Sequence, residues 1–149
     1  EIFATYDDYS LPEPYSKSDN LAIETTARVD LSIPPIERIK NSSITFSDGF
    51  GNSLQSFLQN SQMQIVGTIS NEHDFKQKFV YVFQVKNDKN IIESLSWIQG
   101  EISSKQSLDV SQSWIPKKSG IYEIETFVWN SINNPTALSP FMSTMITIP

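Results

Sequence analysis

Residues 113–124 read Ser113-Trp114-Ile115-Pro116-Lys117-Lys118-Ser119-Gly120-Ile121-Tyr122-Glu123-Ile124, a turn between two strand-like runs. Pro116 ends the first run, Ser107–Ile115, because proline has no backbone N–H to donate to a sheet. Gly120 supplies the tight turn that begins the second run, Ile121–Asn130. The stretch therefore predicts two consecutive β-strands joined by a turn.

The rest of residues 36–149 repeats this arrangement of short runs separated by turn signals. Strand-like runs recur about every 10–15 residues, and no stretch shows a convincing helical period. The pattern predicts an all-β domain, an antiparallel two-sheet sandwich of about 7–9 strands. The other predicted strands are Ser43–Phe46, Gln62–Ser70, Phe79–Lys86, Ile91–Ile98 and Pro140–Ile148.

Residues 114–124 have the form Trp-x-Pro-x-x-x-Gly-x-Tyr-x-Ile. This resembles the start of the penultimate strand in immunoglobulin-like domains of prokaryotic surface proteins, the CARDB-like group among them. The resemblance implies that Tyr122 is the tyrosine of a tyrosine corner, buried with its hydroxyl bonded to the backbone. Ile124 stands where antibody domains have a disulfide cysteine, so the same topology is expected without the disulfide.

Further phrases across roughly residues 43–148 are similar to an immunoglobulin-like module of archaeal cell-surface proteins. These motifs are structural, so the resemblance implies a fold and a cell-surface location but no ligand and no activity. Residues 1–42 lie outside it. The phrases are Asp48-Gly49-Phe50-Gly51-Asn52, Ile69-Ser70-Asn71-Glu72, Phe79-Val80-Tyr81-Val82, Phe127-Val128-Trp129 and Asn134-Pro135-Thr136-Ala137-Leu138-Ser139-Pro140.

The segment before the sandwich carries the clearest period-two alternation in the chain. Residues 1–20 are acidic and turn-rich, which predicts an extended N-terminal arm. Residues 21–35 predict one long amphipathic strand, which Pro34-Pro35 ends. This strand either joins its own domain or is donated to a neighbouring subunit. Its apolar face, the candidate subunit interface, consists of Leu21, Ile23, Ala27, Val29, Leu31 and Ile33.

Composition restricts the partners and the compartment. The formal net charge is −6 over 149 residues, and an acidic surface disfavours nucleic acid. No apolar run approaches the roughly 20 residues needed to cross a bilayer, so no membrane insertion is expected. There is no cysteine, which excludes disulfides and thiolate metal sites. A start at Glu1 and the abundance of Ser, Asn, Gln and Thr favour an extracellular protein, and Asn41-Ser42-Ser43 is a candidate N-glycosylation site at Asn41.

The sequence favours a protein without catalytic chemistry. His73 is the one histidine, flanked by Glu72 and Asp74, and a solvated loop is the simpler interpretation than a metal site. The Asp and Asn residues of the turns at 48–52 and 87–90 suit calcium or, more simply, turn formation. Glu123 and Glu125 are expected on the solvent face of a strand rather than as a glycosidase pair. No nucleophile motif or phosphate loop occurs, so we expect no enzyme, no cofactor and no metal.

Two functions remain open. The first is a structural or adhesive subunit of the cell surface, for example of pilus-like filaments built by donor-strand complementation through residues 21–33. The second is a monomeric immunoglobulin-like binding module that recognises a glycan or a protein through loops Asn71–Lys78, Gly100–Gln106 and Asn130–Pro140. Trp97, Trp114 and Trp129 are candidates for a carbohydrate platform, although buried tryptophans are common in sandwich cores.

Overall fold

The computed structural model describes residues 38–149, and this part of the chain is all-β, with no helix. The predicted fold class is thus confirmed for these residues, whereas the predicted arm (residues 1–20) and strand (residues 21–35) lie outside them. The seven strands are β1 (Lys40–Ser47), β2 (Met63–Ser70), β3 (Gln77–Asn87), β4 (Ile92–Ile102), β5 (Ser107–Trp114), β6 (Gly120–Trp129) and β7 (Met142–Ile148).

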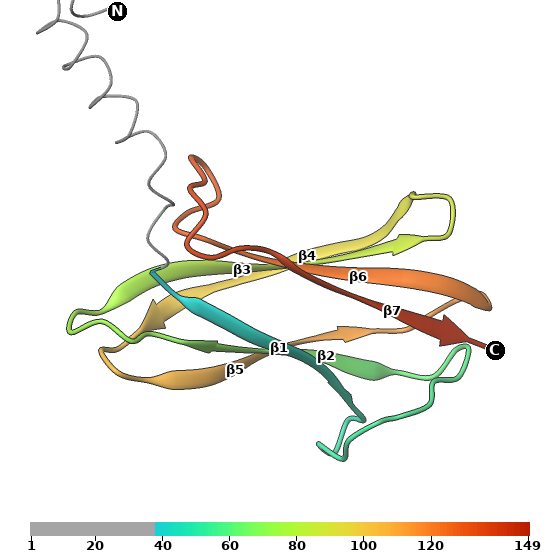
Figure 1. Cartoon of the computed structure of the whole chain (residues 1–149). Coiled ribbons are helices and arrows are strands. Elements are labelled where there is room, and N and C mark those ends of the chain that lie inside the picture. Colours follow the sequence, from blue (N-terminus) through green and yellow to red (C-terminus); the bar gives the residue numbers. More distant parts are fainter. Residues whose placement is uncertain (1–37) are drawn as a thin grey trace, which may run out of the picture. The chain divides into compact units, whose positions relative to one another are not determined.

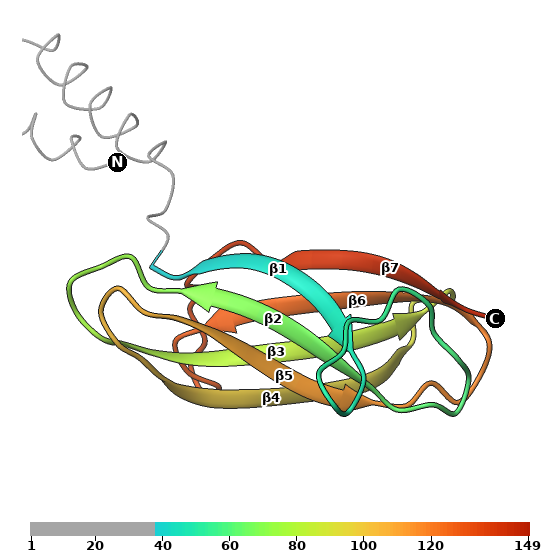
Figure 2. The same ribbon diagram turned by 90° about the horizontal axis from the view of Figure 1, so that it is seen from below.

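The strands form two antiparallel sheets that stack face to face (Figure 1). Sheet A has the strand order β1-β2-β5, and sheet B has the order β4-β3-β6-β7. Figure 2 shows sheet A in front, with the strands of sheet B behind it. The chain changes sheets after β2, after β4 and after β5, which is the long-range connectivity of an immunoglobulin-like sandwich.

The core lies between the sheets, where alternate side chains of each strand point inward. Met63, Ile65 and Ile69 of β2 pack in one buried cluster with Tyr81 and Phe83 of β3. Each large apolar side chain buried in this way stabilises the fold by roughly 1.5–3 kcal/mol before the cost in chain entropy. The predicted burial of most of Phe79–Lys86 is confirmed, since every residue from Phe79 to Phe83 is buried.

A β-bulge at the start of β1 explains why this strand is longer than the predicted run Ser43–Phe46. Asn41 pairs with Ile69 and Ser43 pairs with Thr68, so Ser42 is an extra residue without a partner in the register. The extra residue breaks the period-two pattern in the sequence. It also allows Asn41, before the bulge, and the partly buried Ile44, after it, both to face the core.

The prediction that Gly100–Gln106 is a loop is wrong for its first half. β4 continues to Ile102, because β3 begins at Gln77 and therefore extends far enough to pair with residues 100–102. Ile102 is completely buried in the core, while Gly100 and Glu101, which suggested a turn, are exposed residues. The loop that follows is confined to residues 103–106.

The predicted tyrosine corner is confirmed. Tyr122 is 2% exposed, and its hydroxyl donates a hydrogen bond of 3.0 Å to the carbonyl oxygen of Lys118. Its ring packs edge-to-face on Trp114, with ring centroids 5.1 Å apart. Gly120 has φ +145°, a conformation that favours glycine, at the point where β6 begins. The stretch 113–124 therefore joins the end of β5 in sheet A to the start of β6, the penultimate strand, in sheet B.

Candidate functional site

The middle of β4 presents Leu95 and Trp97 to solvent and its serines to the core, whereas Ile98 and Ile102 point inward. Leu95 and Trp97 are 53% and 50% exposed, whereas Ser94 and Ser96 alternate with them on the inward face. The register fixes these directions, because Ser96 pairs with the core residue Phe83. The solvent face of an antiparallel sheet is normally polar, so this inversion leaves an exposed apolar patch on the outer face of sheet B.

An aromatic row crosses the outer face of sheet B. Trp97 of β4 and Phe127 of β6 flank Val82 of β3 in the register. Phe127 stacks on Phe141 with ring centroids 5.7 Å apart, and lies 5.8 Å from the ring of Trp129. Phe141 is 57% exposed, while Val82 is buried beneath its larger neighbours. We call this surface the aromatic face and define it by Val80, Val82, Trp97, Phe127, Trp129 and Phe141.

A charged cluster borders the aromatic face on one side. Lys86 of β3 forms ion pairs with Glu123 at 3.2 Å and with Glu125 at 3.0 Å. Gln84 donates a hydrogen bond of 2.6 Å to the other carboxylate oxygen of Glu125. These contacts, led by the hydrogen bond from Lys86 to Glu125, raise the pKa of Lys86 above its ordinary value. Each charge in the cluster therefore has a partner of opposite charge, and neither carboxylate is unpaired.

The expectation that Glu125 lies on an ordinary solvent face is wrong. Glu125 does point outward from β6, but it is only 8% exposed. Its register neighbours on the two sides are Gln84 and Ser143, and Lys86 lies over it. A strand in the middle of a sheet has neighbours on both sides, so an outward side chain there can still be buried.

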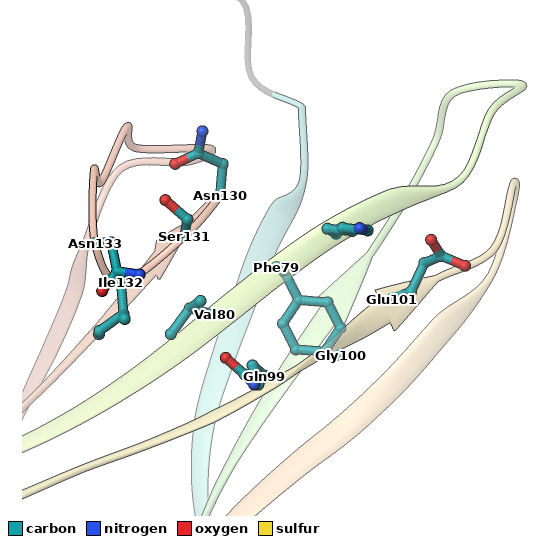
Figure 3. A pocket seen from close by; sticks show the side chains of 10 residues that line it. Phe79, Val80, Gln99, Gly100, Glu101, Asn130, Ser131, Ile132 and Asn133 are labelled. Carbon is teal, nitrogen blue, oxygen red and sulfur yellow. The ribbon is translucent and has the colours of Figure 1, made fainter.

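A groove of about 650 Å³ adjoins the other side of the aromatic face (Figure 3). Its floor and one wall come from Val80 of β3 and Gln99 of β4, and its other wall is the loop 130–133 after β6. The groove and the aromatic face are continuous, since Val80 pairs with both Gln99 and Trp129. The lining residues are Lys78, Phe79, Val80, Gln99, Gly100, Glu101, Asn130, Ser131, Ile132 and Asn133.

The loop that walls the groove is held by its own hydrogen bonds. The side-chain oxygen of Asn130 accepts a bond of 2.8 Å from the backbone N–H of Thr136. The Asn130 N–H in turn donates to the carbonyl oxygen of Thr136 at 3.0 Å, and Leu138 is bonded back to Val128. Loop Asn130–Pro140 is therefore closed by hydrogen bonds at its base on β6, and hydrogen bonds between Ser131 and Asn134 hold its exposed tip.

The three loops proposed for recognition lie at the same end of the sandwich. The register places the end of β2, the start of β3, the end of β4 and the end of β6 together. Asn71, which is 1% exposed, ties two of these loops by donating to the carbonyl oxygens of Phe75 and Ser103 at 2.7 and 3.2 Å. Of these three loops, residues 130–133, Gly100, Glu101 and Lys78 line the groove, whereas residues 71–76 do not.

The three tryptophans of the predicted carbohydrate platform do not lie together. Trp114 is 8% exposed and belongs to the core beside Tyr122. Trp97 and Trp129 lie on the outer face of sheet B, where Phe127 and Phe141 join them. The sequence pattern missed this grouping because Phe79–Phe83 is apolar on both faces, and only Gln84 and Lys86 at the end of the run mark the outer face. The alternation of Leu95 and Trp97 with serines is the signal that could have identified it.

The candidate subunit interface, Leu21, Ile23, Ala27, Val29, Leu31 and Ile33, lies outside the described residues. Asn41, the candidate glycosylation residue, lies in β1 with its side chain between the sheets. Its amide nitrogen donates to the hydroxyl of Thr126 at 3.2 Å, and its amide oxygen accepts from the hydroxyl of Tyr81 at 3.1 Å. The amide thus links β1 of sheet A to β3 and β6 of sheet B.

The residues considered for metal binding have other partners in the structure. The ring of His73 stacks on Phe75 with centroids 5.2 Å apart, and Asp74 pairs with Lys105 at 3.2 Å. Among residues 38–149, no three His, Asp or Glu side chains lie close enough together to hold a metal ion. This same part of the chain contains no helix long and apolar enough to cross a membrane.

Asp48 organises the turn after β1. Its carboxylate accepts hydrogen bonds of 2.8 Å from the backbone N–H groups of Phe50 and Asn52 and from the Asn52 side chain. These bonds, the one from the Asn52 side chain foremost, lower the pKa of Asp48 below its ordinary value. In the β3–β4 hairpin the oxygen of Asn87 likewise accepts from the N–H groups of Lys89 and Ile91. The side-chain oxygens of Asp48 and Asn87 thus already serve as turn-forming acceptors.

No protein-family model matches the chain, and no curated protein matches it. Solved structures with similar folds do exist. The C-terminal domain of Wzt is 14% identical with a TM-score of 0.63, and the match covers 76% of this chain and 75% of that one. A CARDB domain from Pyrococcus furiosus, solved in complex with di-metal ions, is 10% identical with a TM-score of 0.51, and 77% and 97% are covered.

A β-glucuronidase from Bacteroides uniformis is 12% identical with a TM-score of 0.58 over 70% of this chain. The match spans only 13% of that enzyme. All these identities are low, so the comparisons bear on architecture alone. Together with the strand order and the tyrosine corner, the likeness to the Wzt and CARDB domains shows that residues 38–149 have an immunoglobulin-like β-sandwich fold.

Proposed function

We propose that this chain is a non-catalytic binding module of the cell surface, and that the aromatic face of sheet B is its contact surface. The observation that carries the proposal is the inverted pattern of β4, with Leu95 and Trp97 outside and Ser94 and Ser96 inside. Half-exposed aromatic side chains are favoured at recognition surfaces because they bury a large area at a small entropic cost. The groove beside the face adds directional polar groups to this apolar contact.

The absence of catalysis is part of the same proposal. Glu123 and Glu125 are the closest approach to a carboxylate pair beside the face, and both are held by Lys86. Both carboxylates are engaged in ion pairs with Lys86, so neither is available to act on a bound substrate as a general acid or base. The extracellular location is supported by the composition and by the resemblance of residues 43–148 to archaeal surface modules.

Sedimentation with cell envelopes tests the contact surface. The purified full chain is mixed with envelope preparations from its source organism, and the variants Trp97→Ala and Phe141→Ala are compared with Phe50→Ala. Phe50 is 93% exposed in the turn after β1 and makes a matched aromatic control. We expect the two face variants to lose cosedimentation while Phe50→Ala retains it. Equal retention by all three variants would show that the aromatic face is not the contact surface.

A second candidate function is self-assembly by strand donation, and a second groove favours it. β1 and β7 are edge strands of different sheets, and they lie beside each other along one edge of the sandwich (Figures 1 and 2). A groove of about 300 Å³ lies there, lined by Ile44 and Phe46 of β1, by residues 144–146 of β7, and by Leu54 and Phe57. Open edges with adjacent apolar pockets are what an added strand requires.

In this second proposal the backbone of residues 21–33 pairs with the edge strand of a neighbouring copy. The apolar side chains of these residues then fill the groove of that copy. The variant pair Val29→Lys and Leu31→Lys places charges on that face in the full chain, and Arg28→Lys is the control on the opposite face. We expect the first two to lower the oligomeric state measured by light scattering and the control to leave it unchanged. An oligomeric state that is the same in all variants would contradict strand donation.

A further inference from the structure

The aromatic face and the groove form one continuous strip along the strands of sheet B. On β4 the strip runs from Trp97 through Gln99 to Glu101, and on β3 it runs from Val82 through Val80 to Lys78. Four residues of extended strand span about 13 Å. The strip is therefore long enough for several consecutive units of a chain-like ligand, and too long for one small molecule.

The polar groups of the groove are mainly uncharged amides. Gln99, Asn130 and Asn133 line it, and an amide side chain offers both donors and an acceptor (Figure 3). The Asn130 oxygen is already bonded to the Thr136 N–H, so Asn130 offers its amide N–H groups, and the Ser131 hydroxyl is bonded within the loop to Asn134. Such groups suit a ligand whose own groups both donate and accept, which is the property of a polyhydroxylated molecule.

The charges near the strip nearly cancel. Glu101 at the rim pairs with Lys76 at 3.1 Å, and Lys78 lies on the same wall of the groove. On the far border, Lys86 is opposed by Glu123 and Glu125. The strip presents no positive cluster for a polyanion and no unpaired carboxylate cluster for a polycation. An uncharged ligand therefore meets the smallest desolvation cost here.

We propose that the ligand of this strip is an uncharged glycan chain; this inference rests on the proposed function and names the ligand class of the same surface. Sugar rings stack on Trp97 and its aromatic neighbours, because the C–H groups on the face of a sugar ring meet the negative face of an aromatic ring. The next sugars along the chain enter the groove, where their hydroxyls bond to Gln99, Asn130 and Asn133.

The direct test is titration of the full chain with uncharged oligosaccharides of glucose, mannose and galactose, followed by calorimetry and tryptophan fluorescence. At least one series is expected to bind and to gain affinity as the oligosaccharide lengthens. Trp97→Ala is expected to weaken binding about tenfold or more, as for a central aromatic contact. The double variant Gln99→Ala with Asn133→Ala weakens binding without removing an aromatic ring. Phe50→Ala is the control, and thermal unfolding confirms that each variant is folded.

Binding that survives Trp97→Ala and the amide variant unchanged would overturn the proposed strip. If no uncharged glycan binds, the proposed ligand class is overturned. The envelope experiment then tests separately whether the aromatic face is a contact surface. Periodate cleaves the vicinal diols of glycans, whereas protease removes proteins. If cosedimentation is lost after protease but survives periodate, the aromatic face binds protein and only the glycan inference fails. If the face variants also cosediment normally, both the inference and the proposed function fail.

Discussion

Gly67 of β2 lies opposite the phenol of Tyr81 of β3, so close that a methyl group on Gly67 would overlap the Tyr81 hydroxyl. These residues belong to the central strands of the two sheets on which the sandwich is built. Sheets pack about 10 Å apart, and a tyrosine that crosses this gap reaches the opposite backbone. The missing side chain at Gly67 is therefore what allows Tyr81 to be completely buried.

We predict that Gly67→Ala destabilises the fold by about 1–3 kcal/mol, the usual cost of adding a methyl group to a packed core. Urea unfolding followed by tryptophan fluorescence measures this difference. Gly49→Ala is the matched control, because a methyl group there meets nothing within 4 Å.

A second substitution tests whether the loss of stability comes from a direct clash with Tyr81. Tyr81→Phe removes the hydroxyl that the new methyl group would strike, so it should recover part of the loss in the Gly67→Ala background. Strictly additive effects of the two substitutions would contradict a direct clash between these residues.

The local features of the fold were predictable from sequence, because the residues that carry them are neighbours in the chain. The turn before β6 and the hydrogen bond from Tyr122 to Lys118 depend on a stretch of a few residues. The contact between Gly67 and Tyr81 was not predictable, since it depends on how two sheets are superposed. The same is true of Asn41, whose three-residue context reads as a surface sequon but whose side chain bridges the sheets.

The candidate site depends on register in the same way. Trp97, Phe127 and Phe141 come from three separate segments, and only strand pairing brings them onto one face. A run that is apolar on both faces, such as Phe79–Phe83, gives no information about which face is outermost. The loop wall of the groove was predicted as part of Asn130–Pro140, because loop composition is a local signal.

Asn41→Ala should destabilise the fold by about 1–3 kcal/mol, because it leaves the buried hydroxyls of Tyr81 and Thr126 without their shared partner. Ser43→Ala removes the sequon but keeps the amide, and should change stability little. Denaturant unfolding of the two variants measures the contrast, and intact mass after expression in a glycosylating host tests the glycosylation of Asn41. Equal stability of the two variants would contradict the bridging role of the amide.

The tyrosine corner predicts a loss of about 0.5–1.5 kcal/mol in Tyr122→Phe, the net value of one hydrogen bond. The packing of the ring on Trp114 is retained in this variant, so Tyr122→Leu should be markedly less stable than Tyr122→Phe. Thermal unfolding orders the three proteins. If Tyr122→Phe is as stable as the parent, the tyrosine corner stabilises the fold through packing of the ring alone.

Alkaline pH should destabilise the sandwich through its buried tyrosines. Burial raises the pKa of Tyr81 and, together with Glu93 and Asp88, that of Tyr122. A pKa that is higher in the folded state means that the unfolded chain loses its proton first, so this stabilisation is complete below the ordinary tyrosine pKa of about 10 and is lost as pH rises through the folded value. Unfolding curves above that pH should show a smaller loss in Tyr81→Phe than in the parent.

Acidic pH should destabilise the turn after β1 through Asp48. Its hydrogen bonds, above all that from the Asn52 side chain, lower the pKa of the folded carboxyl. The stabilisation is therefore present above the ordinary Asp pKa of about 4 and is lost as pH falls through the lowered folded value. Asp48→Asn should be less stable than the parent at neutral pH, and the difference should shrink in acid. Because the turn is exposed, the effect should be small, and denaturant unfolding at a series of pH values is the suitable measurement. A difference that stays constant across that series would show that Asp48 acts through the shape of the turn, and that the charge of its carboxylate contributes nothing.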